Sequence, residues 1–435
     1  MNILKKTLAF LFTAVLLVSM GTVAFASDDA PASGSIVLNE AITQDGETVS
    51  IKKEVVFTNA EATDVHEPQF IYTYTLTAAT GVSATVKDST GLTATVKDGV
   101  SAAIATASDT IIFNQGVMAH TSAAGTPCVK YADFAFDEDI FTAPGIYRYK
   151  VTETTSAAKG SVGITTSGTY DNVRYLDVYV QKKNASLSNA AGNMKIYGYV
   201  LYEGANEDVS FNGYTGETQN LTAKSDGFTH NSAGYDVYET QNIHVAKTTN
   251  GVLGDKTQDF GFTLTLLTYG GTITTAARVE YYATGGAVLN GPGGTTTTSS
   301  SMQYTFGAAC FGFSGTIRDG ATVNIVGIPT GGTGSTWRLV ETNSSPDSYA
   351  VAMTNNGSSL LASTIVAPSG TATSSTFNVS TAANVAVTNT LDAISPTGFA
   401  ERFTPFVILV ILGVALFVIA RYFVSKHDKQ QITIR

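Results

Sequence analysis

Apolar and polar residues alternate with a period of two through the central part of the chain. Ile51, Val55 and Phe57 share one face of the first such run, and the runs at Phe70–Thr77 and Phe260–Leu266 alternate aromatic or aliphatic residues with threonine. This period is typical of half-buried β-strands, and no helical period is sustained between the two ends of the chain. We therefore expect an all-β fold, with the strand spacing of Ig-like, Greek-key β-sandwiches.

A lysine interrupts the apolar face of one strand in each half of the chain. Lys53 shares the face of Ile51, and Lys247 shares the face of Ile243 and Val245. An unpaired charge is costly to bury, so a lysine on an inward face needs a partner. We expect both lysines to point into a core.

Carboxylate and amide side chains take corresponding inward positions on later strands. Glu153 is in phase with Tyr149 and Val151, Glu341 is in phase with Leu339, and Asn389 is in phase with Val387. The same order of inward residue types in both halves predicts two related domains in tandem. We place domain one at residues 45–240 and domain two at residues 241–392, after a polar linker at residues 27–44.

A buried lysine, acid and amide on facing strands have two interpretations. One is a salt bridge with a hydrogen-bonded amide. The other is autocatalysis, because burial lowers the pKa of a lysine and raises that of a carboxylic acid. A neutral lysine is a nucleophile, and a protonated glutamic acid can polarise a carboxamide and carry its proton. The product would be an isopeptide cross-link between two strands.

The two ends of the chain differ from its middle. Residues 1–26 combine a basic start, an apolar core at Leu8–Val18 and a small-x-small site at Ala24–Ala26, which is the pattern of a secretory signal peptide. Residues 393–435 contain an uncharged apolar run, Phe406–Ala420, followed by basic residues. With its flanks, this run is long enough for a membrane-spanning helix. We expect export by the Sec pathway and a C-terminal transmembrane helix.

Composition narrows the functional classes. A formal net charge of −10 argues against a nucleic-acid partner. The five histidines show no metal-ligand spacing, and no catalytic nucleophile motif is present. The two cysteines lie far apart and make no disulfide framework. We therefore expect no cofactor, no metal and no turnover enzyme.

The residues named so far resemble the intramolecular isopeptide domains of Gram-positive surface proteins. Domain one resembles the streptococcal pilin isopeptide-linkage domain, and domain two is similar to the collagen-adhesin B-type domains of pilins. In domain two the resemblance implies Lys247 as nucleophile, Asn389 as acceptor and Glu341 as the catalytic acid. In domain one it implies Lys53 and Glu153 in the same roles, with Asp236 as the acceptor and Asn231 as the rival acceptor.

The C-terminal segment Ile394–Gly398 resembles a cell-wall sorting signal, although Ile394 and Ser395 depart from the usual Leu-Pro start. The resemblance implies that a sortase cuts between Thr397 and Gly398 and transfers the new acyl end to an amine of another pilin subunit or of peptidoglycan. A plain membrane anchor is the alternative.

Two functions fit these features. One is a structural pilin subunit of a fibre at the cell wall, and the other is a monomeric wall-anchored adhesin. A pilin needs an accessible acceptor lysine, for which Lys182, Lys183 and Lys224 are candidates that we expect to be exposed. Neither the ligand nor the sortase class follows from the sequence.

Overall fold

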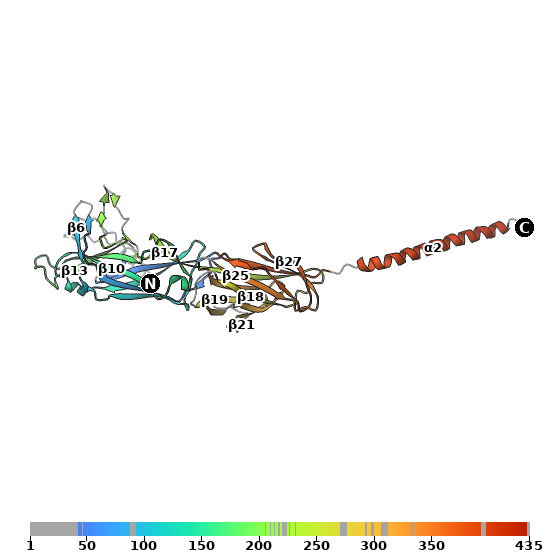
Figure 1. Ribbon diagram of the computed structural model, residues 1–435, viewed down its shortest axis with the longest axis horizontal. Coiled ribbons are helices and arrows are strands. Elements are labelled where there is room, and N and C mark those ends of the chain that lie inside the picture. The colour runs from blue at the N-terminus through green and yellow to red at the C-terminus, as the bar shows by residue number, and fades with distance from the viewer. Residues whose placement is uncertain are drawn as a thin grey trace, which may run out of the picture.

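The computed structural model describes residues 42–432, and its gaps are residues 46, 88–92, 205, 209, 213, 216–217, 220–223, 226, 231, 270–275, 292–293, 297–299, 306–311, 332–333 and 393–396. Two β-rich bodies lie end to end, and one long helix follows them (Figure 1). The all-β expectation is confirmed for the domains. The expected signal peptide and most of the linker lie outside the described residues.

Domain one is a sandwich of two sheets that enclose an aromatic core. Its first sheet contains β1 (Ile42–Asp45), β2 (Thr48–Asn59), β9 (Thr126–Ala135), β11 (Ile164–Gly168) and the first part of β17 (Gly234–Asn250). Its second sheet contains β4 (Phe70–Ala78), β5 (Thr85–Lys87), β6 (Thr93–Asp98), β7 (Ser108–Phe113), β10 (Gly145–Thr155), β12 (Val173–Lys182), β13 (Met194–Tyr202) and β14 (Phe211–Asn212). The smaller elements are β3 (Val65–His66), β8 (Met118–Ala119), β15 (Tyr214–Thr215), β16 (Thr218–Gln219) and the 3₁₀ helices η2 (Ser101–Ala103), η3 (Glu138–Ile140) and η4 (Lys159–Val162).

Domain two is also a two-sheet sandwich. One sheet has the order β22 (Ser300–Thr305), β19 (Ala276–Thr284), β24 (Thr322–Pro329), β17, β30 (Ala383–Thr390), β26 (Tyr349–Asn355) and β27 (Ser358–Val366). The other contains β21 (Gly294–Thr296), β20 (Val288–Gly291), β23 (Gly312–Ile317), β18 (Phe260–Tyr269), β25 (Ser335–Thr342), β28 (Thr371–Thr373) and β29 (Phe377–Val379).

Strand β17 belongs to both domains. Its first part pairs in parallel with β2, with Asp236 opposite Val55, and its last part pairs in parallel with β30, with Lys247 opposite Val387. The boundary expected between residues 240 and 241 therefore falls inside one continuous strand. Because no loop interrupts β17, the two domains are joined by hydrogen-bonded backbone.

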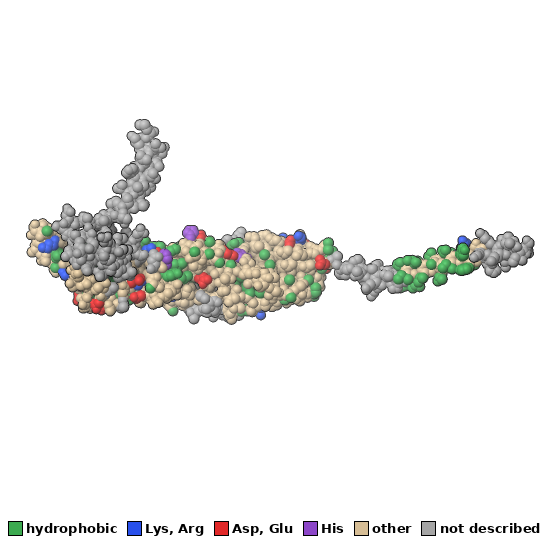
Figure 2. Space-filling view, turned by 90° about the horizontal axis from the view of Figure 1, so that it is seen from above, with side chains coloured by type: hydrophobic (Ala, Val, Ile, Leu, Met, Phe, Trp, Pro, Cys, Tyr) green, Lys and Arg blue, Asp and Glu red, His purple; other side chains and the backbone are tan. Residues whose placement is uncertain are grey.

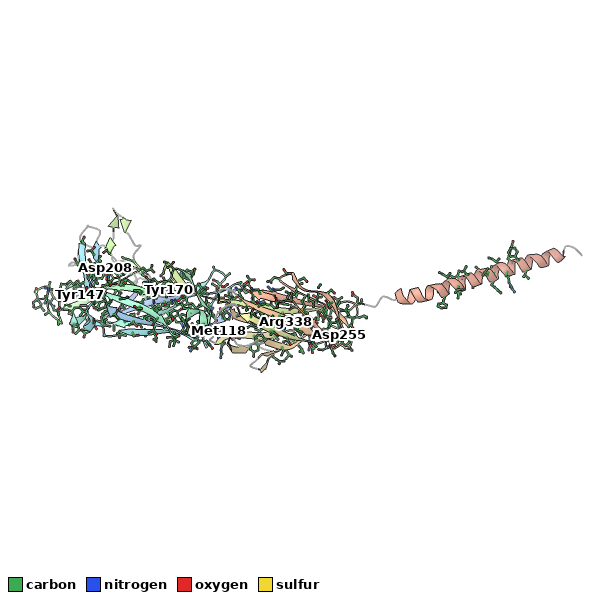
Figure 3. The ribbon with its side chains drawn as sticks, viewed as in Figure 1. Met118, Tyr147, Tyr170, Asp208, Asp255 and Arg338 are labelled. Atoms are coloured by element: carbon green, nitrogen blue, oxygen red, sulfur yellow. The ribbon has the colours of Figure 1, made fainter. Side chains whose placement is uncertain are left out.

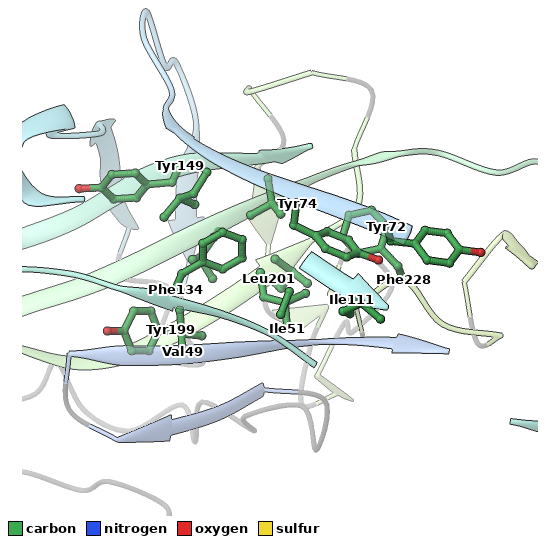
Figure 4. Close-up of a cluster of buried hydrophobic side chains, with 14 of the residues drawn as sticks. Val49, Ile51, Tyr72, Tyr74, Ile111, Phe134, Tyr149, Tyr199, Leu201 and Phe228 are labelled. Atoms are coloured by element: carbon green, nitrogen blue, oxygen red, sulfur yellow. The ribbon is translucent and has the colours of Figure 1, made fainter. Parts of the chain in front are cut away.

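The hydrophobic cores follow the period-two pattern of the strands. In domain one, Ile51, Tyr74 and Phe134 meet between the two sheets (Figure 4). In domain two, Trp337 and Leu339 of β25 lie in a separate buried cluster. Each core is enclosed by the inward faces of its strands. These faces carry mostly apolar residues, together with the few buried polar residues described below.

Helix α2 (Thr397–Ile432) follows domain two. Its stretch Phe406–Ser425 has a mean hydropathy of 2.7 and is long and apolar enough to cross a membrane. These side chains are exposed, and Figure 2 shows an almost continuous apolar surface along this part of the helix. The position of this stretch agrees with the apolar run in the sequence.

Candidate functional site: a buried polar cluster in each sandwich

The cluster in domain two joins three strands. Lys247 and Asn389 lie on the neighbouring parallel strands β17 and β30, and Glu341 lies on β25 of the facing sheet. The Lys247 ammonium contacts Oε2 of Glu341, and Nδ2 of Asn389 donates to Oε1 of Glu341 at 2.7 Å. One carboxylate therefore bridges the lysine and the amide inside an otherwise apolar core.

Burial changes the chemistry of Lys247. Loss of solvation outweighs the attraction of Glu341 and lowers the pKa of Lys247 from 10.5 to about 8. The ring of Phe260 lies 4.2 Å from the Lys247 nitrogen, so an aromatic face covers the lysine. Near neutral pH, a far larger fraction of Lys247 is therefore in the neutral, nucleophilic form than of a surface lysine.

The carbonyl oxygen of Asn389 has no hydrogen-bond partner among the described residues, although it is buried. Such an oxygen is rare, because an unpaired buried polar atom costs about 1–3 kcal/mol. Rotation of the amide by half a turn would place this oxygen against Glu341, and the two orientations differ only in which atom is assigned as nitrogen. A protonated Glu341 could then donate a hydrogen bond to the carbonyl.

The cluster in domain one has the same layout. Lys53 lies on β2, Asp236 lies on the neighbouring strand β17, and Glu153 lies on β10 of the facing sheet. The Lys53 nitrogen is 2.7 Å from Oδ2 of Asp236 and 3.2 Å from Oε2 of Glu153. All three side chains are fully or almost fully buried. The structure thus brings together the lysine, the acid and the expected acceptor in each domain.

Three tyrosines surround the domain-one cluster. Tyr72 donates to Oδ2 of Asp236 at 2.8 Å, and Tyr74 donates to Oε2 of Glu153 at 2.7 Å. The hydroxyl of Tyr170 donates to Oε1 of Glu153 and accepts a hydrogen bond from Lys53 at 2.8 Å. Tyr170 lies between the outer end of domain one and the junction with domain two (Figure 3). Burial, followed by the nearby carboxylates, raises the pKa of all three hydroxyls well above 10, so they act as hydrogen-bond donors.

A second lysine reaches the same carboxylate. Lys159, at the start of η4, lies 2.9 Å from Oδ1 of Asp236 and 3.4 Å from Oε1 of Glu153. Burial alone would raise the pKa of Asp236, but the charges and hydrogen bonds of Lys53 and Lys159 lower it. Asp236 is therefore held as a carboxylate between two ammonium groups.

The sequence pattern does not reveal Lys159 or the roles of the tyrosines. Lys159 lies between β10 and β11, in residues 156–163, where the 3₁₀ helix η4 is the regular element and no strand period marks an inward face. The tyrosines were visible only as inward aromatic residues, because their hydroxyl partners come from strands distant in sequence. The rival acceptor Asn231 lies outside the described residues.

Two of the three candidate acceptor lysines, Lys182 and Lys224, are less exposed than expected. Lys182 is half-buried and donates to the carbonyl of Leu187 at 3.0 Å. Lys224 is half-buried, and desolvation lowers its pKa, so its expected exposure is wrong. Lys183 is exposed, and its ion pairs with Asp139 at 2.8 Å and Glu138 at 3.0 Å raise its pKa.

The remaining expected sites have simpler outcomes. Thr397 and Gly398 lie at the start of helix α2, and their side chains are not among those that the structure describes. The described residues contain no cluster of histidine, cysteine or acidic side chains that would hold a metal. Cys128 is a half-buried free thiol, and Cys310 lies outside the described residues.

Comparisons with known proteins give matches among solved structures. No family model and no curated protein matches the chain. The chain is similar to the major pilin from Streptococcus pyogenes, with 18% identity, 80% of this chain and 100% of that chain covered, and a TM-score of 0.38. It is also similar to the pilus-presented adhesin Spy0125 (Cpa), with 10% identity, coverage of 79% and 99%, and a TM-score of 0.20. At these values the likeness concerns the fold alone.

Proposed function

We propose that this chain is a structural subunit of a cell-surface fibre, stabilised by one autocatalytic isopeptide bond in each domain. The observation that carries the proposal is the repeated cluster, with a buried lysine and its acceptor on adjacent parallel strands and a glutamate on the facing sheet. A buried ion pair alone is weak support for stability, because desolvation offsets the attraction. Two such clusters at equivalent places favour a chemical role.

In domain two, the bond forms between Nζ of Lys247 and the side-chain carbonyl carbon of Asn389. The proton of Lys247 passes to Glu341, which leaves a neutral amine to attack the carbonyl. Protonated Glu341 polarises the carbonyl, and the C–N bond to the amide nitrogen breaks, so that one ammonia leaves. Because the fold holds the amine and the amide next to each other, the reaction needs no bimolecular encounter and is accelerated.

In domain one, the bond forms between Nζ of Lys53 and the side-chain carboxyl carbon of Asp236. An ammonium and a carboxylate condense to an amide and one water, with Glu153 carrying protons between them. The bond joins β2 to β17, as the domain-two bond joins β17 to β30. The chain acts on itself in both reactions and turns over no separate substrate.

The C-terminal segment supplies attachment in this proposal. Helix α2 holds the exported chain in the membrane until a sortase cuts between Thr397 and Gly398. The acyl end then joins an amine of a neighbouring subunit or of peptidoglycan. Lys183 is the exposed member of the candidate acceptors, and its nitrogen must leave Glu138 and Asp139 before it can react.

Immunoblotting of cell-wall extracts tests the assembly. A fibre subunit gives a ladder of regularly spaced bands that survives boiling in detergent, and the Lys183→Arg variant tests whether this lysine links the subunits. A single band at the monomer mass would reject the fibre and favour the wall-anchored adhesin.

A further inference from the structure

The domain-one cluster contains a second lysine, Lys159, that takes no part in the proposed bond. Lys53 and Lys159 contact different oxygens of Asp236, Oδ2 and Oδ1, and both lie within 3.4 Å of Glu153. Two cations thus face two anions in this pocket. In domain two, by contrast, Lys247 faces Glu341 and a neutral amide.

Condensation changes the charges of the two clusters differently. In domain two, the proton of Lys247 stays on Glu341 while neutral ammonia leaves, so no charge remains. In domain one, the Lys53 ammonium and the Asp236 carboxylate become an amide and water, which removes one positive and one negative charge. Glu153 would then be a buried, unpaired anion, which is expensive in an apolar core.

Lys159 lies close enough to Glu153 to supply the missing positive charge. Before any bond forms, its nitrogen already lies 3.4 Å from Oε1 of Glu153, so it needs no rearrangement to pair with Glu153 once Lys53 loses its charge. Its side chain is 19% exposed, whereas that of Lys53 is fully buried, and its nitrogen lies 3.4 Å from the centre of the Tyr170 ring. Aromatic rings lie beside both nitrogens, since the centre of the Tyr72 ring is 4.2 Å from that of Lys53, so burial is the property that distinguishes the two lysines. Of the two lysines, Lys53 is therefore the nucleophile.

We propose that Lys159 is a positioning residue for the domain-one bond: it holds Oδ1 of Asp236 while Lys53 approaches, stays unreacted, and then balances the charge of Glu153. This inference rests on the proposed isopeptide bond and adds a requirement to it. Around Glu153, the other titratable groups are Lys53 of β2, Tyr72 and Tyr74 of β4, Tyr170 before β12 and Asp236 of β17. Of these, Lys53 and Asp236 are consumed and the tyrosines stay neutral.

The pH profile of cross-linking separates this role from a merely structural one. Without Lys159, Glu153 must take up a proton as the bond forms, so the reaction should slow as pH rises, by up to about tenfold per pH unit. With Lys159 present, no net proton is taken up, and the profile should be flatter. Arginine keeps the charge and should keep the wild-type profile.

The experiment follows bond formation during cell-free synthesis of the mature chain across roughly pH 6 to 9, with samples quenched in acid. Intact mass and peptide mapping of Lys159→Met, Lys159→Gln, Lys159→Arg and wild type report the domain-one bond, and the domain-two bond in the same molecule reports folding. We expect a steeper decline with pH in the methionine and glutamine variants only. Parallel profiles for all four proteins, or a mapped Lys159–Asp236 link, would overturn the role of Lys159. Absence of any domain-one bond in the wild type would overturn the proposed bond itself, and the role of Lys159 with it.

Discussion

Replacing Glu341 by glutamine should stop bond formation in domain two while preserving the shape of the side chain. Glutamine cannot take up a proton and deliver it, so the carbonyl of Asn389 is not polarised and its amide nitrogen is not protonated as it leaves. The protein should then keep its full domain-two mass, because no ammonia is lost. The buried contacts of Glu341 come from Lys247 and Asn389, and the amide oxygen of glutamine can still accept one of them.

The loss of stability follows from the length of chain that the bond closes. Lys247 and Asn389 enclose a loop of about 140 residues, and the chain-entropy relation for cross-links gives about 5 kcal/mol for this length. For a domain of this size, 5 kcal/mol corresponds to a fall in Tm of about 10–20 °C. Calorimetry of the mature chain should show this fall in one transition, with the domain-one transition unchanged.

A second route to the unlinked state controls for the lost ion pair. Lys247→Met also prevents the bond, and it fills the space of the lysine stem with an apolar side chain. Both variants should lose stability by a similar amount if the missing cross-link is the main cause. A Glu341→Gln protein that still lacks one ammonia in domain two, or that melts at the wild-type temperature, would refute the assigned role.

Two further predictions concern other parts of the chain. Wall-released protein should end at Thr397, and mass spectrometry that finds the basic C-terminal peptide still attached would reject sorting in favour of a membrane anchor. In an Asn389→Ala variant, unreacted Lys247 has a pKa of about 8 in the folded state against 10.5 as the ordinary value. Between these values the unfolded state binds more protons, so stability should rise with pH by about 3 kcal/mol and stay level below pH 8. A pH-melting series that shows no rise relative to Lys247→Met/Asn389→Ala would contradict the depressed pKa.

Much of the fold could be predicted because the strands carry a clear period of two. The alternation within a single strand was enough to predict that Lys53 points inward, and the same holds for Lys247. Both lysines are buried in the structure. The continuity of β17 could not be read from the pattern. Two domains that share a strand show the same alternation as two domains joined by a short linker.

The cluster in domain two was easier to predict than the cluster in domain one. Lys247, Glu341 and Asn389 all lie in regular strands, where phase decides which side chain points inward. Lys159 lies outside the strands, so its approach to Asp236 depends on the path of the loop that leads into η4. Surface exposure was also harder to predict, since Lys224 is covered by tertiary contacts that the local sequence does not reveal.

The most direct test of the central claim is the intact mass of the folded mature chain, residues 27–397. We expect a mass lower than the calculated value by one ammonia and one water. Lys53→Ala should restore the water alone, whereas Lys52→Ala, on the opposite face of β2, should restore nothing. A deficit of two ammonias would move the domain-one acceptor to Asn231. A full calculated mass would contradict both bonds and leave two β-sandwiches with buried ion pairs.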